Sequence, residues 1–292
     1  MKGRKVIILA GLTALVVLSM AVCYGFFREP NHVRLRTIMV QSGGLADHLA
    51  GKRAVLISDL HIGSRFHRAA AEALRMISEL KPDLIFLTGD YVKWNGKTAA
   101  YENALDFMSR LKAPLGVYAV FGDSDYSFSR KSCEFCHEAG GYGPVTRHSV
   151  KFFKNSGKYI ETDKGRVFIA GIDAGPGLDE ATGIASLLSK DAPVILLTHS
   201  SVIFDSIDTG TDILVLSGDT HGGQVFLPEV IWKLIKWKPD PEHMHGFFQE
   251  RKKALYVTSG IGTSHLPFRL GVPPEVVVIQ FGDKGRTGHE DV

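Results

Sequence analysis

Carboxylate and imidazole side chains recur along the chain, each directly after a short apolar run. A single Asp-x-His would suit a turn acid beside a surface histidine, but five runs end in this way. Gathered in one place, such groups would repel one another unless cations neutralised them, so the pattern predicts a metal site. The seven candidate ligands are Asp59, His61, Asp90, Asp123, His199, Asp219 and His221.

The apolar runs before these residues predict the elements that must position them. Runs of four to six residues rich in Val, Ile, Leu and Phe are typical of buried strands, and they cover 54–58, 83–88, 117–121, 194–198 and 213–217. Helical patterns at 69–80 and 99–111 separate the first three, which predicts βαβ units. Polar groups at the carboxyl ends of such strands share one crevice. Further runs predict a second sheet, at 33–40, 166–170, 255–258 and 276–281.

The composition is that of a packed protein. The 292 residues hold 34 Lys+Arg and 31 Asp+Glu, a net charge of +3, and 45% are hydrophobic. These values exclude a disordered tail, a collagen-like repeat and a strongly basic nucleic-acid binder, so no nucleic-acid partner is expected. Three cysteines are too few for a disulfide framework.

An uncharged stretch of 22 residues, 6–27, lies near the N-terminus. At about 1.5 Å per residue it spans the roughly 30 Å hydrocarbon layer of a membrane, so residues 1–30 are expected to be a membrane anchor. A cleaved signal segment is the alternative, since Ser19 and Ala21 are small residues of the kind a signal peptidase reads. The stretch exceeds the usual apolar core of a signal peptide, which favours the anchor.

The charges flanking this stretch do not decide its orientation. Three basic residues precede it (Lys2, Arg4 and Lys5), and three follow it (Arg28, Arg34 and Arg36). We adopt the ordinary arrangement for one N-terminal apolar segment. It predicts a single-pass protein of the cytoplasmic (inner) membrane with its soluble part on the exported side.

The order and spacing of the motifs resemble those of the calcineurin-like metallophosphoesterases over about residues 53–281. That family has D-x-H, G-D, G-N-H-D/E, an isolated H and G-H-x-H, and this chain has SDLHIG, LTGDY, VFGDSDY, LLTHSS and LSGDTHGGQ. SGIGTSHLPFRLGVPPEV at 259–276 resembles the membrane-associated branch, which includes the UDP-2,3-diacylglucosamine pyrophosphatases of lipid A biosynthesis. The resemblance implies an α/β fold over 31–292, with two mixed β-sheets in a sandwich flanked by helices.

The resemblance also implies a dinuclear metal centre. One divalent ion would be held by Asp59, His61, Asp90 and His221. The second would share Asp90 as the bridge and add Asp123, His199 and Asp219. In two-metal hydrolysis the pair generates the nucleophile and offsets charge on the phosphoryl oxygens, so Asp90 and His221 are the expected catalytic positions.

Two positions depart from the family pattern. Asp123-Ser124 stands where the family has Asn-His, so Ser124 occupies the catalytic position of a histidine that assists the leaving group, and Asp219 replaces the first histidine of the last motif. General acid assistance is typically worth ~10²–10⁴-fold. The extra carboxylates are hard ligands that favour Mn²⁺, Mg²⁺ or Fe²⁺ over Zn²⁺ at the second site.

A Cys-x-x-Cys-His segment lies within an irregular insertion at about 127–147. Cys133, Cys136 and His137 match the attachment signal for covalent haem c, in which the histidine ligates iron. His148 is the first candidate for the opposite axial position. A labile disulfide and a zinc site built from the same side chains are the alternatives.

The C-terminal third contains an amphipathic segment and three further histidines. Residues 228–238 form an amphipathic pattern with Trp and Lys, which suits either a membrane surface or packing on the sheets. His243, His245 and His265 are expected to be surface groups or to support the ligands, because seven candidates already fill two metal sites.

Together these features predict a membrane-anchored metallophosphoesterase that hydrolyses a phosphodiester or pyrophosphate bond, with a lipid or nucleotide-lipid among the candidate substrates. The competing hypothesis is a non-hydrolytic redox or sensor protein that carries haem on the same scaffold. Ser124 and Asp219 favour the competitor, whereas the intact Asp59, His61 and Asp90 favour the enzyme.

Overall fold

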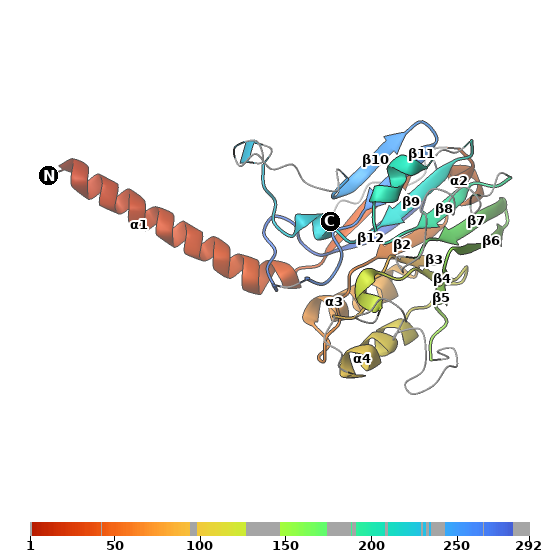
Figure 1. The fold of residues 1–292 in the computed structure, drawn as a ribbon, viewed down its shortest axis with the longest axis horizontal. Helices are drawn as coiled ribbons and strands as arrows, with labels where there is room; N and C mark the ends of the chain where they lie inside the picture. Colours follow the sequence, from red (N-terminus) through yellow and green to blue (C-terminus); the bar gives the residue numbers. More distant parts are fainter. Residues whose placement is uncertain are drawn as a thin grey trace.

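The strand-forming runs assemble into two mixed sheets in the computed structural model (Figure 1). The structure describes residues 2–41, 43–93, 98–126, 147–173, 188, 191–207, 210–228, 230–231, 234, 243–264 and 266–282. Within these ranges each sheet has six strands, and α-helices lie on the outside. This arrangement confirms the predicted fold class.

The first sheet has the order β1-β12-β2-β3-β4-β5. All neighbouring strands run parallel except β12 and β2, which are antiparallel. The bounds are β1 Arg34–Val40, β12 Glu275–Phe281, β2 Arg53–Ile57, β3 Leu84–Leu87, β4 Val117–Ala119 and β5 Lys151–Phe152.

The second sheet has the order β10-β11-β9-β8-β7-β6. Its four central strands are parallel, and the two edge strands are antiparallel to their neighbours. The bounds are β10 Gly246–Glu250, β11 Lys253–Val257, β9 Ile213–Ser217, β8 Val194–Leu197, β7 Gly165–Gly171 and β6 Ser156–Thr162.

The predicted strands exist, but two of those assigned to the second sheet do not belong there. The runs at 33–40 and 276–281 form β1 and β12, which join the first sheet beside β2, whereas β8 and β9 lie at the centre of the second. An apolar run shows that a strand is buried but not which strand it pairs with, because pairing is decided by packing between distant segments.

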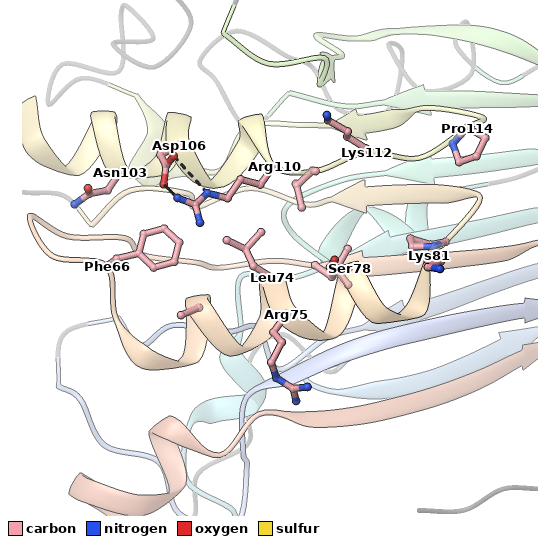
Figure 2. A pocket seen from close by; sticks show the side chains of 14 residues that line it. Phe66, Leu74, Arg75, Ser78, Lys81, Asn103, Asp106, Arg110, Lys112 and Pro114 are labelled. Atoms are coloured by element: carbon pink, nitrogen blue, oxygen red, sulfur yellow. Dashed lines mark hydrogen bonds and ion pairs between the residues drawn. The ribbon is translucent and has the colours of Figure 1, made fainter.

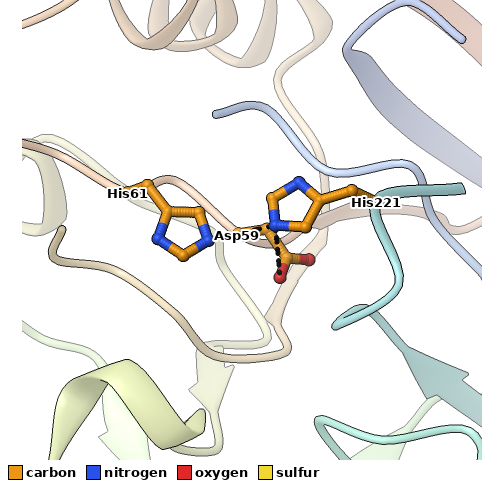
Figure 3. Close-up of side chains that lie close together, drawn as sticks. All are labelled: Asp59, His61 and His221. Carbon is orange, nitrogen blue, oxygen red and sulfur yellow. Dashed lines mark hydrogen bonds and ion pairs between the residues drawn. The ribbon is translucent and has the colours of Figure 1, made fainter. Parts of the chain in front are cut away.

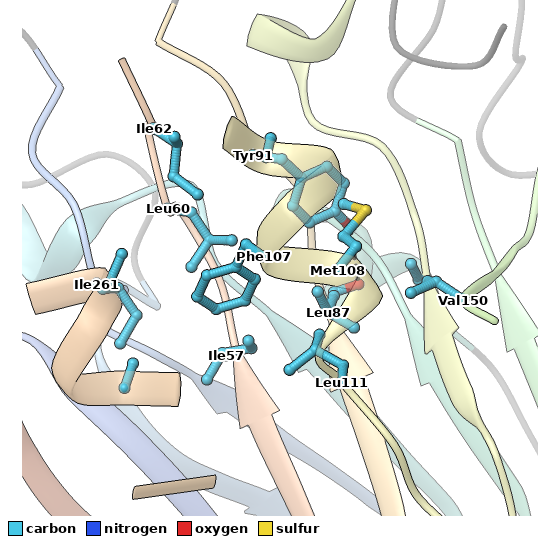
Figure 4. Packing of buried hydrophobic residues seen from close by; sticks show 14 of the residues in the cluster. Ile57, Leu60, Ile62, Leu87, Tyr91, Phe107, Met108, Leu111, Val150 and Ile261 are labelled. Atoms are coloured by element: carbon cyan, nitrogen blue, oxygen red, sulfur yellow. Dashed lines mark hydrogen bonds between the residues drawn. The ribbon is translucent and has the colours of Figure 1, made fainter. Parts of the chain in front are cut away.

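Two α-helices cover the outer face of the first sheet. They are α3 (Arg68–Leu80) and α4 (Thr98–Ser109), each placed between consecutive parallel strands. The side chains of Ala69, Ala73 and Ile77 recur every four residues along α3 and are buried. They pack in a cluster with Phe107 of α4 and the side chains of β2 and β3 that point the same way (Figure 4).

A second apolar layer fills the space between the sheets. Leu56 and Phe86 contribute to it from the first sheet, and Leu197 and Leu216 contribute from the second. The remaining elements are short helices and helical turns. They are α2 (Gly43–His48), the 3₁₀ turns η3 (Asp123–Asp125), η4 (Val202–Ser206) and η5 (His221–Gly223), and at the end of the first helix η1 (Tyr24–Arg28) and η2 (Glu29–Asn31).

The N-terminal helix α1 (Lys2–Cys23) projects from the sheets (Figure 1). With η1 and η2 it makes one helical stretch, Gly3–Asn31, and an 18-residue window within it has a mean hydropathy of 2.7 and is exposed. By length and composition this stretch can cross a membrane, and among the described residues it is the one helix that can. The position predicted for the apolar segment is therefore occupied by a helix suited to lipid.

The packing between the sheets makes Phe86→Ala a test of this architecture. Removing a fully buried phenylalanine deletes its contacts and leaves a cavity, which costs about 3–5 kcal/mol. Urea denaturation in detergent should show this loss in the free energy of unfolding. Leu35→Ala on β1, where the side chain is half exposed, should cost under about 1 kcal/mol. Equal losses for the two variants would contradict the described core.

Candidate metal centre

The seven candidate ligands meet where the carboxyl ends of β2, β3 and β4 face those of β8 and β9. Most of them lie in turns with left-handed backbone, a conformation that costs non-glycine residues roughly 1–2 kcal/mol each. The left-handed conformation turns these side chains toward one crevice. Strained turns of this kind cluster at functional sites. The values of φ are 52° for Asp59, 42° for His61, 57° for Asp90, 71° for Asp219 and 51° for His221.

One group of possible ligands consists of Asp59, His61 and His221 (Figure 3). The two imidazole Nε2 atoms face each other at 3.0 Å, and Nε2 of His221 lies 3.6 Å from Oδ1 of Asp59. All three side chains are buried. Burial lowers the pKa of His61 to about 4 and that of His221 well below its ordinary value. Both rings are therefore neutral at pH 7, the form that binds a metal ion.

A second group surrounds His199. Its Nδ1 lies 2.7 Å from the Thr88 carbonyl, to which it donates, so in the neutral ring the lone pair is on Nε2. That Nε2 is buried without a hydrogen-bond partner among the described residues, and it lies 3.5 Å from Asp90, 3.7 Å from Asp219 and 3.8 Å from Asp123. Ligand atoms around one cation stand roughly 3–3.5 Å apart when each is about 2.1 Å from it. The donor set therefore fits a divalent ion.

Two carboxylates link these groups. Oδ2 of Asp90 lies 3.4 Å from Nε2 of His61, and its Oδ1 faces His199. Asp59 also comes within reach of both groups, together with Asp90 and His199. Sequence reasoning gave the bridging role to Asp90 alone. The geometry brings Asp59 to a comparable position, because the two loops that carry these residues lie side by side.

The centre is electrostatically unbalanced without cations. Burial raises the pKa of Asp59 to about 7. For Asp90 burial acts in the same direction, but His199, His61 and hydrogen bonds from Ser124 outweigh it and lower the pKa. Burial disfavours a charged His199, yet Asp90, Asp59 and Asp219 raise its pKa to about 10. A proton on His199 and a divalent cation would thus compete for the same charge-balancing role.

Ser124 supports Asp90 directly. Its backbone N–H donates to Oδ1 and its hydroxyl donates to Oδ2, both at 2.9 Å. Ser124 therefore lies in the crevice, and its hydroxyl fixes the orientation of the Asp90 carboxylate. Asp123 and Asp219 lie at the open side, with about half of each side chain exposed.

Asp125 is a residue of the centre that sequence reasoning missed. It is fully buried and accepts backbone N–H bonds from Asp90 (2.9 Å), Tyr91 (2.8 Å) and Gly122 (2.8 Å). Burial, with the charge of Asp90, raises its pKa to about 8. Its carboxylate ties the loop after β3 to the loop after β4. The signal was available, because Asp125 matches the acid that closes the G-N-H-D/E motif.

Arg269 is the second missed residue. Its guanidinium is fully buried and donates to the carbonyls of Ser259 (2.7 Å), Gly262 (2.6 Å) and Val272 (3.0 Å). Its Nη2 lies 3.3 Å from Nδ1 of His221, which itself bonds to the Gly262 carbonyl. Burial lowers the pKa of Arg269 to about 10, so it stays charged at pH 7. Arg269 therefore fixes the backbone that orients His221.

Two glycines allow the ligand loops to approach closely. A Cβ at Gly122 would collide with the carboxylate and backbone N of Asp90, and one at Gly218 would collide with Ser58 and with the carboxylate of Asp59. Neither collision involves the far end of a flexible surface side chain. Any larger residue at these positions would displace a candidate ligand.

The haem prediction falls largely outside the described residues. Cys133, Cys136 and His137 lie there, and His148 is half-buried with its ring 5.7 Å from that of Phe152. That hypothesis therefore stays a prediction. His265 is also outside the described residues.

The remaining C-terminal features are partly described. His245 contacts the buried carboxylate of Glu275 at 3.3 Å, and His243 packs between aromatic rings. Neither belongs to a ligand group. Within 228–238, Val230 and Leu234 are 67% and 76% exposed, so the alternative in which this face packs on the sheets is wrong for these two side chains.

One cavity lies away from this centre. It has a volume of about 860 Å³ and lies between α3 and α4, and Phe66, Leu74, Arg110 and Lys112 are among the residues that line it (Figure 2). None of the candidate ligands lines it. Its size therefore carries no argument for catalysis there.

The sequence is similar to those of several known proteins. The sequence profile of the calcineurin-like phosphoesterases matches residues 52–260. Bacillus subtilis YkuE, an uncharacterized metallophosphoesterase, is 28% identical, with 87% of this chain and 88% of YkuE covered. A transmembrane protein with metallophosphoesterase domain from Danio rerio is 26% identical over 91% of this chain and 61% of its own length. The UDP-2,3-diacylglucosamine pyrophosphatase LpxG of Chlamydia muridarum is 24% identical, covering 86% and 90%.

The contacts of Asp125 lead to a test of its supporting role. Asp125→Asn replaces an acceptor oxygen with a donor facing backbone N–H groups, and each buried group left unpaired costs about 1–3 kcal/mol. We expect a lower melting temperature and weaker metal binding, measured by thermal unfolding and by metal content after dialysis. Asp163→Asn, on the turn between β6 and β7, should change neither. Unchanged metal content in Asp125→Asn would show that this carboxylate does not position the ligands.

Proposed function

The chain belongs to the calcineurin-like phosphoesterase family, and from that premise we propose that it is a membrane-anchored hydrolase of phosphodiester or pyrophosphate bonds that uses two divalent cations. One observation carries the proposal. The buried Nε2 of His199 has no hydrogen-bond partner among the described residues but faces three carboxylates. A second group of possible ligands lies beside it, which shares Asp59 and whose His61 lies 3.4 Å from Asp90.

The donor chemistry supports two cations. Asp59, Asp90, Asp123 and Asp219 supply up to four negative charges within one crevice, which two divalent ions would offset. When bound, such ions supply Lewis acidity and make water nucleophilic at neutral pH. His61, His199 and His221 would hold them through neutral nitrogens, and carboxylate oxygens on the open side favour Mn²⁺, Mg²⁺ or Fe²⁺.

The residues of the chain would orient the reacting bond and balance its charges. Hydrolysis adds the oxygen of water to phosphorus and breaks the bond to the leaving oxygen, which departs with the electron pair and takes up a proton. A diphosphate esterified at both ends yields two phosphate monoesters in this way. Asp123 and Asp219 line the open side, where the released group would leave, and Ser124 keeps Asp90 in place.

Two observations support a substrate that resides in the membrane. The relative from Chlamydia muridarum is named for a diacylated sugar linked to a nucleotide by pyrophosphate. In this chain α1 has the length and apolarity to cross a bilayer, and its end packs on the loop that carries Arg269. We propose a lipid-linked pyrophosphate or phosphodiester as substrate, hydrolysed on the exported side of the cytoplasmic membrane.

Asp90→Ala tests the dinuclear proposal. This carboxylate faces both His61 and His199, so its removal should release at least one ion and lower hydrolysis of bis(p-nitrophenyl) phosphate by about 10³-fold or more. Elemental analysis and absorbance at 405 nm provide the two measurements. Asp106→Ala, which removes a surface carboxylate paired with Arg110 on α4, is the control and should behave as wild type. Hydrolysis that survives Asp90→Ala would refute the proposal.

Ser124→His tests whether the missing acid limits turnover. A leaving alkoxide needs a proton whereas p-nitrophenolate does not, so the variant should raise kcat about 10-fold or more on an alkyl phosphodiester and change it little on the chromogenic one. Ser124→Ala removes the hydroxyl bond to Asp90 without adding an acid, and it should accelerate neither reaction. A lower kcat for Ser124→His on both substrates would show that Ser124 serves only to hold Asp90.

A further inference from the structure

A cavity of about 270 Å³ connects the candidate metal centre with the base of the N-terminal helix. His61 lines it, and so do Phe26, Pro30 and Asn31 from the turns that follow α1. A candidate metal ligand and the end of an apolar helix thus share one space, although they lie far apart in the sequence.

Two cationic side chains line the same cavity. Arg65 is exposed and Lys93 is half-buried, and within the described ranges neither forms an ion pair. Both cations share this lining with His61 and His67, which places their charge beside a candidate metal ligand. An anionic group bound here would face positive charge, because neither Asp123 nor Asp219 lines this cavity.

The wall at the helix end is fixed to the loop that supports the centre. The carbonyl of Gly25 accepts from the backbone N–H of Arg269 at 3.0 Å, and the buried Glu29 accepts from that of Gly271 at 3.0 Å. The ring of Phe26 packs on that of Phe268, with centroids 4.8 Å apart. The wall is therefore a built part of the site and not a loose end of the helix.

Exposed apolar side chains mark the level at which lipid would begin. Phe27 and Leu266 are 78% and 62% exposed beside this wall. Phe226 is also exposed, and its backbone N–H bonds to Leu270 at 2.7 Å. Apolar groups clustered around the end of an apolar helix suit the boundary between headgroups and acyl chains. The cavity would then open at the membrane surface.

We propose that this cavity binds the second anionic group of a membrane-resident diphosphate, on Arg65 and Lys93, while the acyl chains of that substrate stay in the bilayer beside α1. The inference rests on the proposed function and specifies its substrate class. It has a geometric reason, since the phosphorus attacked at the metal centre and the neighbouring phosphate are only one bridging oxygen apart. An enzyme of this kind acts on lipid in its own membrane.

Competition against a chromogenic substrate tests the proposal whether or not the chosen lipid is cleaved. Full-length protein is reconstituted in phosphatidylcholine vesicles, and hydrolysis of bis(p-nitrophenyl) phosphate is followed with CDP-diacylglycerol as competitor. The lipid should inhibit when it is in the same vesicles and should fail to inhibit when confined to separate ones. CDP-glycerol, which has the same pyrophosphate without acyl chains, should inhibit at least 10-fold more weakly.

The double variant Arg65→Gln/Lys93→Gln tests the cationic pair. The ratio of the inhibition constant of the lipid to the KM of the chromogenic substrate should rise about 10-fold or more, because charge-assisted contacts to phosphate are lost. Lys81→Gln/Lys112→Gln removes two cations from the cavity between α3 and α4 and should leave that ratio unchanged.

Specific outcomes would overturn the proposal. These are equal competition by CDP-glycerol and the lipid, an unchanged ratio in the Arg65/Lys93 variant, or no competition by lipid in the same vesicles. Failure of the proposed function would look different, since wild-type protein loaded with metal would then not hydrolyse bis(p-nitrophenyl) phosphate at all.

Discussion

The burial of three carboxyl groups close together is the constraint on which the rest of this structure depends. Asp59, Asp90 and Asp125 are buried close to one another, although Asp59 is far from Asp125 in the sequence, and water cannot screen their charges there. Such a cluster is tolerated only if hydrogen bonds and cations compensate it. Backbone N–H groups saturate Asp125, whereas Asp59 and Asp90 face imidazoles. Asp125 is therefore a structural carboxylate, whereas Asp59 and Asp90 are available to metal ions.

Both sheets contribute side chains to the cluster of carboxylates and imidazoles. The first sheet supplies Asp59, His61 and Asp90 from the ends of β2 and β3, and the second supplies His199 and His221 after β8 and β9. The apolar layer between the sheets sets their separation, so the distances around His199 depend on how Phe86 and Leu216 pack. Strained turns then direct the side chains inward, and the stability of the core offsets the cost of that strain.

The candidate ligands that the structure brings together could be named from the sequence because they lie directly after the strands. Asp59, His61, Asp90, His199 and His221 could be named from apolar runs that stop at acid or histidine. Which strands share a sheet could not be predicted, since β1 and β12 are joined by contacts between opposite ends of the chain. Arg269 was missed for the same reason, because a buried arginine looks like a surface one until the carbonyls of Ser259 and Gly262 are seen around it.

Because the helical stretch that follows α1 is bonded to the loop behind His221, insertion of α1 in a bilayer would couple the membrane mechanically to the site. Gly25 and Glu29 bond to Arg269 and Gly271, so a rotation of α1 would pull directly on the segment that orients a candidate ligand. Helices tilt when membrane thickness does not match their apolar length. Lipid composition would therefore tune this centre through the angle of α1, and a detergent micelle would hold it in a different mechanical state from a bilayer.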